Sequence, residues 1–183
     1  MHAITAANLR NAYGGESMAH MRYGIWGEVA GQEGFKNVAR LFQAISSAEI
    51  IHASNHFREL KNEVGDSLCA SMAVFGVGDT SQNLQGGIDG ETYEVNEMYP
   101  TYLETAKFQA EKGAQRSFYY ALSAEKTHAA LFQKAKLAID SDRKDVALGT
   151  IQICTVCGWT HEGDIPDKCP ICGVSKDKFQ TFA

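Results

Sequence analysis

The chain has 183 residues, of which 44% are hydrophobic, and its formal net charge is −5. This length can bury one good core and carry a small appended unit, while the mild acidity argues against a nucleic-acid partner, because phosphate binding needs a basic surface. Since no apolar run reaches 18 residues and the N-terminus lacks the charged start and apolar stretch of a secretory signal, we expect a cytoplasmic protein without a membrane span.

Four segments repeat apolar residues at steps of three and four, the periodicity of an amphipathic helix. They span about residues 5–30, 34–63, 81–111 and 113–139. Ser81 is a plausible N-cap for the third segment. Short turns at 31–34 and 112–113 join the segments into two hairpins, whereas residues 64–80 are long enough to cross the length of a bundle. The pattern predicts an all-α four-helix bundle of the ferritin-like type, with one long crossover.

An acidic residue interrupts the apolar stripe of every predicted helix. These residues are Glu16, Glu49, Glu91 and Glu125. One buried carboxylate is costly unless it is paired, so four of them indicate that the stripes meet something positive. On the third helix we expect the inner face to continue through Met98 and Tyr102.

The second and fourth helices carry the same motif. RLFQAISSAEIIHA (40–53) and RSFYYALSAEKTHA (116–129) match at one fixed offset, and GES at 15–17 is echoed by GET at 90–92. The two hairpins are therefore read as copies of one unit. In a two-fold bundle this places one set of donors opposite the other: Glu16, Glu49 and His52 opposite Glu91, Glu125 and His128. In Glu-x-x-His the two side chains share one helix face, so both can reach one point.

Four carboxylates and two imidazoles converging in a bundle core are the ligand set of di-iron or di-manganese carboxylate proteins. A single Glu-x-x-His is more often a surface glutamate beside a core histidine, but two copies favour a dinuclear metal site. Glu94, three residues after Glu91, is a further candidate ligand, and its repeat partner is Ala19. Glu97 is expected to face solvent, and His56 to be structural.

The last thirty or so residues carry four of the five cysteines, as Cys154-x-x-Cys157 and Cys169-x-x-Cys172. Four thiolates in this pattern predict a tetrahedral metal site with no open position, and the spacing alone leaves structural zinc and iron both open. We therefore divide the chain into the bundle (1–140), a charged linker (141–150) and a small metal-binding tail (151–183). The lone Cys69 lies in the crossover and is read as packing.

Taken together, these motifs resemble the rubrerythrin family and its close variant nigerythrin over nearly the whole chain. The matching stretches are GESMAHMRY (15–23), SAEIIHA (47–53), GETYEVNEMYP (90–100), SAEKTHA (123–129) and the rubredoxin-like CTVCGWTHEGDIPDKCPICG (154–173). They do not choose between the two variants. The resemblance implies a small rubredoxin-like β/loop domain with iron in the tail. It also implies a peroxidase that reduces hydrogen peroxide to water, with electrons from NAD(P)H through a separate reductase or a rubredoxin.

The resemblance also implies a role for each ligand. Glu16 would bind one iron and Glu91 the other, Glu49 and Glu125 would bridge them, and His128 would complete the iron bound by Glu91.

The resemblance further implies that His52 and Glu94 alternate on the other iron. Oxidised iron would take the carboxylate and reduced iron the imidazole, as expected because ferric iron is harder. Tyr23 and Tyr99 would donate hydrogen bonds to the carboxylate ligands, with plain packing as the alternative for both.

Three other functions stay open. The bundle could serve a ferroxidase or iron store, the tail could be the functional part of an electron-transfer protein, or the site could reduce dioxygen. Glu94 and the fused tail argue against storage, which needs no one-electron relay. If the tail and bundle of one chain are too far apart, a partner subunit's tail would deliver the electrons, so we expect a homodimer or larger assembly.

Overall fold

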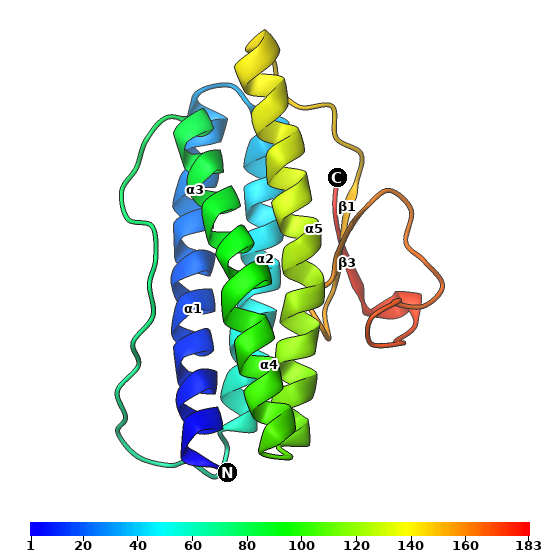
Figure 1. The fold of residues 1–183 in the computed structure, drawn as a ribbon. Coiled ribbons are helices and arrows are strands. Elements are labelled where there is room, and N and C mark those ends of the chain that lie inside the picture. Colours follow the sequence, from blue (N-terminus) through cyan, green and yellow to red (C-terminus); the bar gives the residue numbers. More distant parts are fainter.

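The structure is a computed structural model that describes residues 1–183. Its main body is a bundle of four long helical rods, the third of which is built from three consecutive pieces (Figure 1). The pieces in chain order are α1 (Ala3–Gln32), α2 (Lys36–Glu59), α3 (Thr80–Tyr93), a π turn (Glu94–Met98), α4 (Tyr99–Phe108) and α5 (Lys112–Asp142). The predicted four-helix bundle with one long crossover is confirmed. No helix combines the length and the apolar character of a membrane span.

The helix ends differ from the sequence prediction by a few residues. The second helix is shorter than predicted, while the first and fourth are longer. The predicted N-cap Ser81 is wrong: Asp79 caps α3, because its carboxylate accepts from the Gln82 N–H at 2.8 Å and the Gln82 side chain accepts from the Asp79 N–H at 3.0 Å. The Ser81 hydroxyl instead donates to Asp140 of α5 at 2.6 Å.

A π turn at Glu94–Met98 interrupts the third rod. In α1, Tyr23 lies seven residues after Glu16, which is two turns along the same face. In the third rod, Tyr99 lies eight residues after Glu91, and the π turn absorbs the extra residue. The expected inner face is therefore only partly right: Met98 and Tyr99 are buried, whereas Tyr102 is half-buried.

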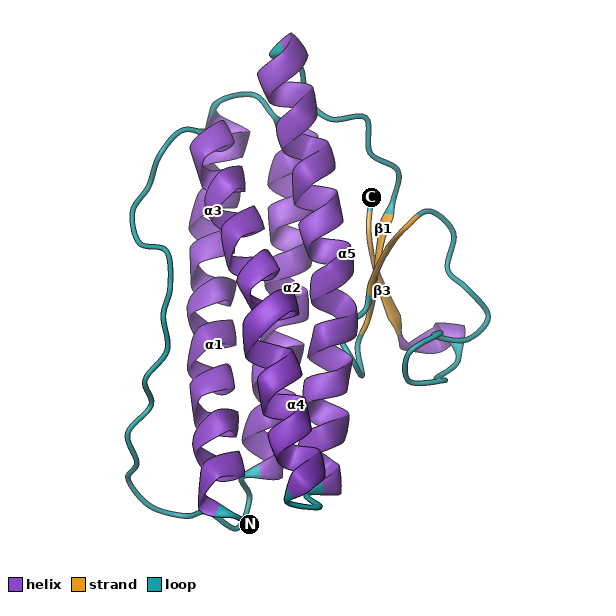
Figure 2. Ribbon diagram, viewed as in Figure 1, coloured by secondary structure: helices purple, strands orange, loops and turns teal.

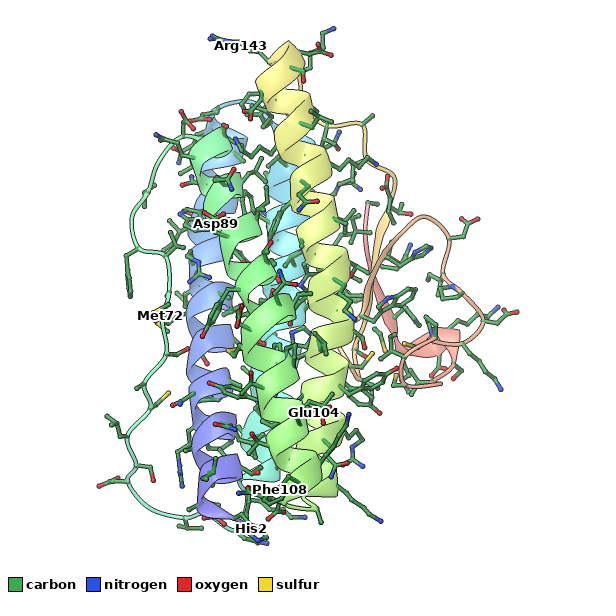
Figure 3. The ribbon with its side chains drawn as sticks, viewed as in Figure 1. His2, Met72, Asp89, Glu104, Phe108 and Arg143 are labelled. Atoms are coloured by element: carbon green, nitrogen blue, oxygen red, sulfur yellow. The ribbon has the colours of Figure 1, made fainter.

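The crossover, residues 64–79, runs as an extended segment along the outside of α1 (Figure 1). The Trp26 indole donates to the Gly76 carbonyl at 3.0 Å, and the Asn11 side chain accepts from the Ala70 N–H at 3.1 Å. The predicted packing role of Cys69 holds only in part, because its side chain lies against α1 while the residue stays exposed. Met72, labelled in Figure 3, belongs to this segment and is 80% exposed.

The bundle core consists of two apolar clusters at different heights. One is built around Trp26, Phe42 and Phe132, and the other around Leu9 and Phe118. The buried glutamates of α1 and α2 fall between the two clusters along the chain. The polar layer is thus enclosed above and below by apolar side chains, which keep water away from it.

The tail forms a three-stranded antiparallel sheet in the order β2-β1-β3. Its strands are β1 (Ile151–Cys154), β2 (Thr160–Glu162) and β3 (Phe179–Phe182), drawn in orange beside α5 in Figure 2. Ile151 and Ile153 belong to the same apolar cluster as Trp26, so the sheet packs directly on the bundle. The small metal-binding β unit predicted for the tail is confirmed. The division at residues 140 and 150 stays a prediction.

Candidate metal centres

Six buried donor side chains meet in the middle of the bundle, and none is more than 1% exposed. Their donor atoms form two overlapping groups, in each of which all atoms lie within 4.8 Å of one another. The first group is Glu16, Glu49, His52 and Glu125, and the second is Glu49, Glu91, Glu125 and His128. α1 and α3 each supply one glutamate, while α2 and α5 each supply a glutamate and a histidine three residues later. Each hairpin therefore supplies two glutamates and one histidine, so the two halves of the cluster repeat the same set of donors.

Glu49 and Glu125 are the two carboxylates common to both groups. His52 Nδ1 lies 2.9 Å from an oxygen of each. His128 Nδ1 lies 3.2 Å from the other oxygen of Glu49 and 2.6 Å from the other oxygen of Glu125. Each of these carboxylates therefore presents one oxygen to each half of the site, which is the geometry that a bridging ligand needs.

The donor set fits a pair of divalent or trivalent cations. Several of its fully buried atoms make no well-aligned hydrogen bond even where an imidazole nitrogen lies close, among them both Glu125 oxygens and His128 Nδ1. Buried polar atoms rarely lack partners, so these lone pairs are available for metal. Burial and the neighbouring carboxylates raise the pKa of Glu91 to about 8 and that of Glu16 well above its usual range. Positive charge would relieve this repulsion, and mixed oxygen and nitrogen donors suit iron.

Two tyrosines hold the outer carboxylates. The Tyr23 hydroxyl donates to Glu91 at 2.6 Å, and the Tyr99 hydroxyl donates to Glu16. Burial raises the pKa of both tyrosines, so both keep their protons and act as donors. The structure therefore gives both residues a hydrogen bond to a carboxylate, beyond packing.

Glu94 is the candidate ligand that the structure leaves outside both groups. It lies in the π turn, is half-buried, and has one carboxylate oxygen beside Gly15, which precedes Glu16 in α1. His52, with which the resemblance implies that Glu94 alternates, belongs to the first group of donors. Glu97 is exposed, as predicted. π turns often occur at functional sites, but no residue in this segment predicts one from sequence.

The tail covers the outer nitrogens of both histidines. Thr160 Oγ1 lies 2.7 Å from His128 Nε2 and donates its own proton to the Gly158 carbonyl at 3.1 Å. The threonine oxygen must therefore accept from His128 Nε2–H. In the neutral form of the ring, which is the form that binds metal, this leaves the lone pair on Nδ1. Gly158 lies against the His52 imidazole so closely that a Cβ at this position would overlap the ring.

The concern that tail and bundle of one chain lie too far apart is therefore not borne out. The Asn55 side chain also donates to the Val156 carbonyl in the same cysteine turn, at 2.9 Å. Sequence reasoning missed Asn55, Gly158 and Thr160 as site residues. The only signal in the sequence is Gly158, which follows the second cysteine of its motif, and a tight turn around the thiolates is enough to explain a glycine there.

The four cysteines of the tail form the second candidate centre. Cys154 and Cys172 sulfurs lie 3.5 Å apart, and those of Cys157 and Cys169 lie 3.6 Å apart. These separations are close to the roughly 3.8 Å edge of a tetrahedron whose corners lie about 2.3 Å from a metal. A hydrogen bond from the Cys157 thiol lowers the pKa of Cys154 to about 5, while burial raises that of Cys172 to about 12. Four thiolates here need a cation among them.

The fold and the two centres define a ferritin-like dinuclear carboxylate protein fused to a four-thiolate metal unit. The family model named Rubrerythrin matches residues 7–136, and the model of the rubredoxin-like domain of rubrerythrin matches residues 152–180. The chain belongs to the rubrerythrin family.

Individual relatives agree with this assignment. Rubrerythrin-2 of Clostridium acetobutylicum is 54% identical over 181 residues, which cover 99% of this chain and 98% of the relative. Nigerythrin of Nitratidesulfovibrio vulgaris is 32% identical over a match that covers 97% of this chain and 86% of the nigerythrin chain. A solved structure of fully reduced, all-ferrous nigerythrin matches with a TM-score of 0.84 at 31% identity, over 97% of this chain and 86% of that one.

Family membership identifies the cofactors. The glutamate and histidine cluster is the di-iron site of the family, and the four cysteines are its rubredoxin-like iron site. The predicted two irons in the bundle and one iron in the tail are confirmed, and iron replaces the zinc alternative. The protein is a di-iron oxidoreductase of this family.

Proposed function

We propose that the protein is a peroxidase that reduces hydrogen peroxide to water and thereby protects against oxidative stress. Each turnover takes one peroxide, two protons and two electrons and yields two water molecules. The electrons come from an NAD(P)H-dependent reductase or a rubredoxin and enter through the four-cysteine iron. The observation that best supports this proposal is the contact of the first cysteine turn and the start of β2 with both histidines of the cluster, through Gly158 and Thr160.

We assign the ligand roles from the geometry and the family resemblance together. The proposed ligands are Glu16 and His52 on one iron, Glu91 and His128 on the other, and Glu49 and Glu125 as bridges. When bound, the ferrous pair supplies one electron from each ion, which matches the two-electron cleavage of the O–O bond. The surrounding aromatic side chains, Phe42 and Phe132 among them, exclude water from the layer.

Glu94 is the proposed alternate ligand for the iron that His52 holds. Its place beside Gly15, outside the cluster, fits the state in which His52 is the ligand. Burial of the carboxyl group itself, with the neighbouring Glu91 carboxylate, raises the pKa of Glu94 well above its usual range, so this group can hold a proton while it is off the metal. Water or this carboxyl group would supply the protons that peroxide cleavage consumes.

Anaerobic stopped-flow mixing of the fully reduced protein with hydrogen peroxide tests the proposal. Oxidation of the di-iron site should be much faster with peroxide than with dioxygen. Equal rates would remove the peroxidase claim and leave an oxidase.

Substitution of Cys154 by Ser separates the two centres. The variant should still be oxidised by peroxide in a single turnover, but should lose steady-state turnover that depends on NAD(P)H. Growth of an iron mineral during aerobic turnover would instead support the ferroxidase alternative. The homodimer and the identity of the donor stay predictions.

A further inference from the structure

His56 lies one turn beyond His52 on α2 and has no place in either group of metal donors. Its ring is fully buried and is bonded on both sides. Nε2 lies 2.9 Å from the Tyr99 hydroxyl, and Nδ1 lies 2.8 Å from the Ser117 hydroxyl of α5. Because the Tyr99 hydroxyl also donates to Glu16, a continuous chain of hydrogen bonds runs from Ser117 to the di-iron site.

The direction of this chain follows from counting protons. The Tyr99 hydroxyl has one proton, which it gives to Glu16, so its oxygen must accept from His56 Nε2–H. Burial lowers the pKa of His56 to about 3, so the ring is neutral and carries a single N–H. Nδ1 must then accept from the Ser117 hydroxyl. Every link donates towards the carboxylate.

The other half of the duplicated site has no such chain of hydrogen bonds. At the offset that relates Glu49 to Glu125, the counterpart of His56 is Phe132 and the counterpart of Ser117 is Leu41. Phe132 packs against Tyr23, the counterpart of Tyr99, with ring centroids 5.2 Å apart. Packing alone is thus served by apolar residues at both positions. The polar pair on the Glu16 side needs a different reason.

We propose that His56, locked by Ser117, is a positioning residue that holds Tyr99 as an obligate hydrogen-bond donor to Glu16 and so tunes the redox state of the iron on that side. The His56 ring is 3.9 Å from Glu16, too far for a hydrogen bond of its own, so it acts through Tyr99. Each donor in a chain polarises the next, which strengthens the bond to the carboxylate. A carboxylate that is held more strongly gives less charge to its metal and favours ferrous iron.

Substitution of His56 by Phe copies the other half of the site and keeps an aromatic ring in place. The loss of one buried hydrogen bond of about 1.4 kcal/mol should lower the ferrous-to-ferric ratio on the Glu16 side roughly tenfold at fixed potential. For a one-electron step this equals about 59 mV. Potentiometric titration monitored by Mössbauer spectroscopy, which distinguishes the two irons, measures the shift. His56→Gln, which retains an N–H donor, should restore part of the potential.

Ser117→Ala provides an independent variant in case the ring substitution disturbs folding. Without the serine proton the His56 tautomer can reverse, so that Tyr99 donates to the ring rather than to Glu16, and the potential should shift in the same direction. Ser123→Ala is the matched control, because the Ser123 hydroxyl lies on the same helix and donates only to the Tyr119 carbonyl.

A folded, fully loaded His56→Phe protein with an unchanged potential overturns the proposal, and so does an equal shift at both irons. The readout is a potential rather than turnover. The inference therefore rests on the iron site alone and can fail or stand independently of the peroxidase proposal.

Discussion

Replacing Gly158 by Ala should displace the tail from the di-iron site without harming the tail's own iron. A Cβ at this position would lie 2.5 Å from His52 Cδ2 and 3.1 Å from its Cε1, where ordinary contacts are 3.4–4 Å. The turn and the start of β2 must therefore withdraw by about 1 Å, which breaks the hydrogen bonds between Thr160 and His128 and between Val156 and Asn55. Two hydrogen bonds of about 1 kcal/mol each correspond to a roughly thirtyfold lower docked population.

Gly173→Ala is the matched control for this experiment. Gly173 occupies the same position in the second cysteine turn and has the same φ of +78° as Gly158, but a Cβ there would meet nothing within 4 Å. Both variants carry the cost of a left-handed alanine, about 1–2 kcal/mol, and only Gly158→Ala adds the overlap with His52.

Internal electron transfer is the quantity to measure. Stopped-flow spectroscopy should follow the tail iron as it passes an electron to the oxidised di-iron site. The rate should fall roughly thirtyfold in Gly158→Ala and stay near the wild-type value in Gly173→Ala. Equal rates in both variants would refute the view that this turn is the contact through which the tail serves its own bundle.

Three further outcomes are expected. Thr160→Val removes the acceptor of His128 Nε2–H and should weaken iron binding in the bundle roughly tenfold to a hundredfold, measured by chelator competition, with the tail iron retained. Phe42→Ala should lower the free energy of unfolding in urea by about 3–5 kcal/mol, whereas Phe108→Ala, at a site 91% exposed, should change it by less than about 0.5 kcal/mol. In the iron-free protein, burial raises the pKa of Glu91 from 4.5 to about 8, so the folded state keeps a proton that the unfolded state has lost, and thermal stability should fall as pH rises between these values. The raised pKa of His128 acts in the same direction above pH 6.5, and reloading iron should flatten the slope.

The donor residues of the bundle could be predicted because two constraints coincide in the sequence. Glu and His three residues apart must share a helix face, and the repetition of the motif makes an accidental match improbable. Glu16 and Glu91 followed from the same helical spacing on the preceding helices. These inferences need only local geometry, which is why all six residues meet in the structure.

The contacts made by the tail could not be predicted, because each residue involved has an ordinary local explanation. Gly158 is needed by the turn that follows a cysteine pair, Thr160 suits a strand, and Asn55 suits an exposed helix face. Only their placement against the bundle gives them a role. The π turn is similar, since nothing at Glu94–Met98 distinguishes it from a regular helix until Tyr99 is seen to share a face with Glu91.

The two halves of the duplicated site differ in three respects, and each difference sets the Glu16 half apart from the other. The Glu16 half has an additional carboxylate, Glu94, where the other half has Ala19. It has His56 behind its tyrosine where the other half has Phe132.

The third difference lies in the histidines themselves. His128 is fixed by the bond to Thr160, whereas His52 Nε2 has no hydrogen-bond partner. An imidazole whose second nitrogen has no hydrogen bond can leave the metal without breaking such a bond. An imidazole that is held at both nitrogens must lose that hydrogen bond as well. The Glu94 carboxylate lies beside Gly15 on the same side of the site, and the chain of hydrogen-bond donors from Ser117 ends at Glu16. The proposed exchange between His52 and Glu94 requires one half of the site to stay fixed and the other to rearrange, and these three differences fit that requirement.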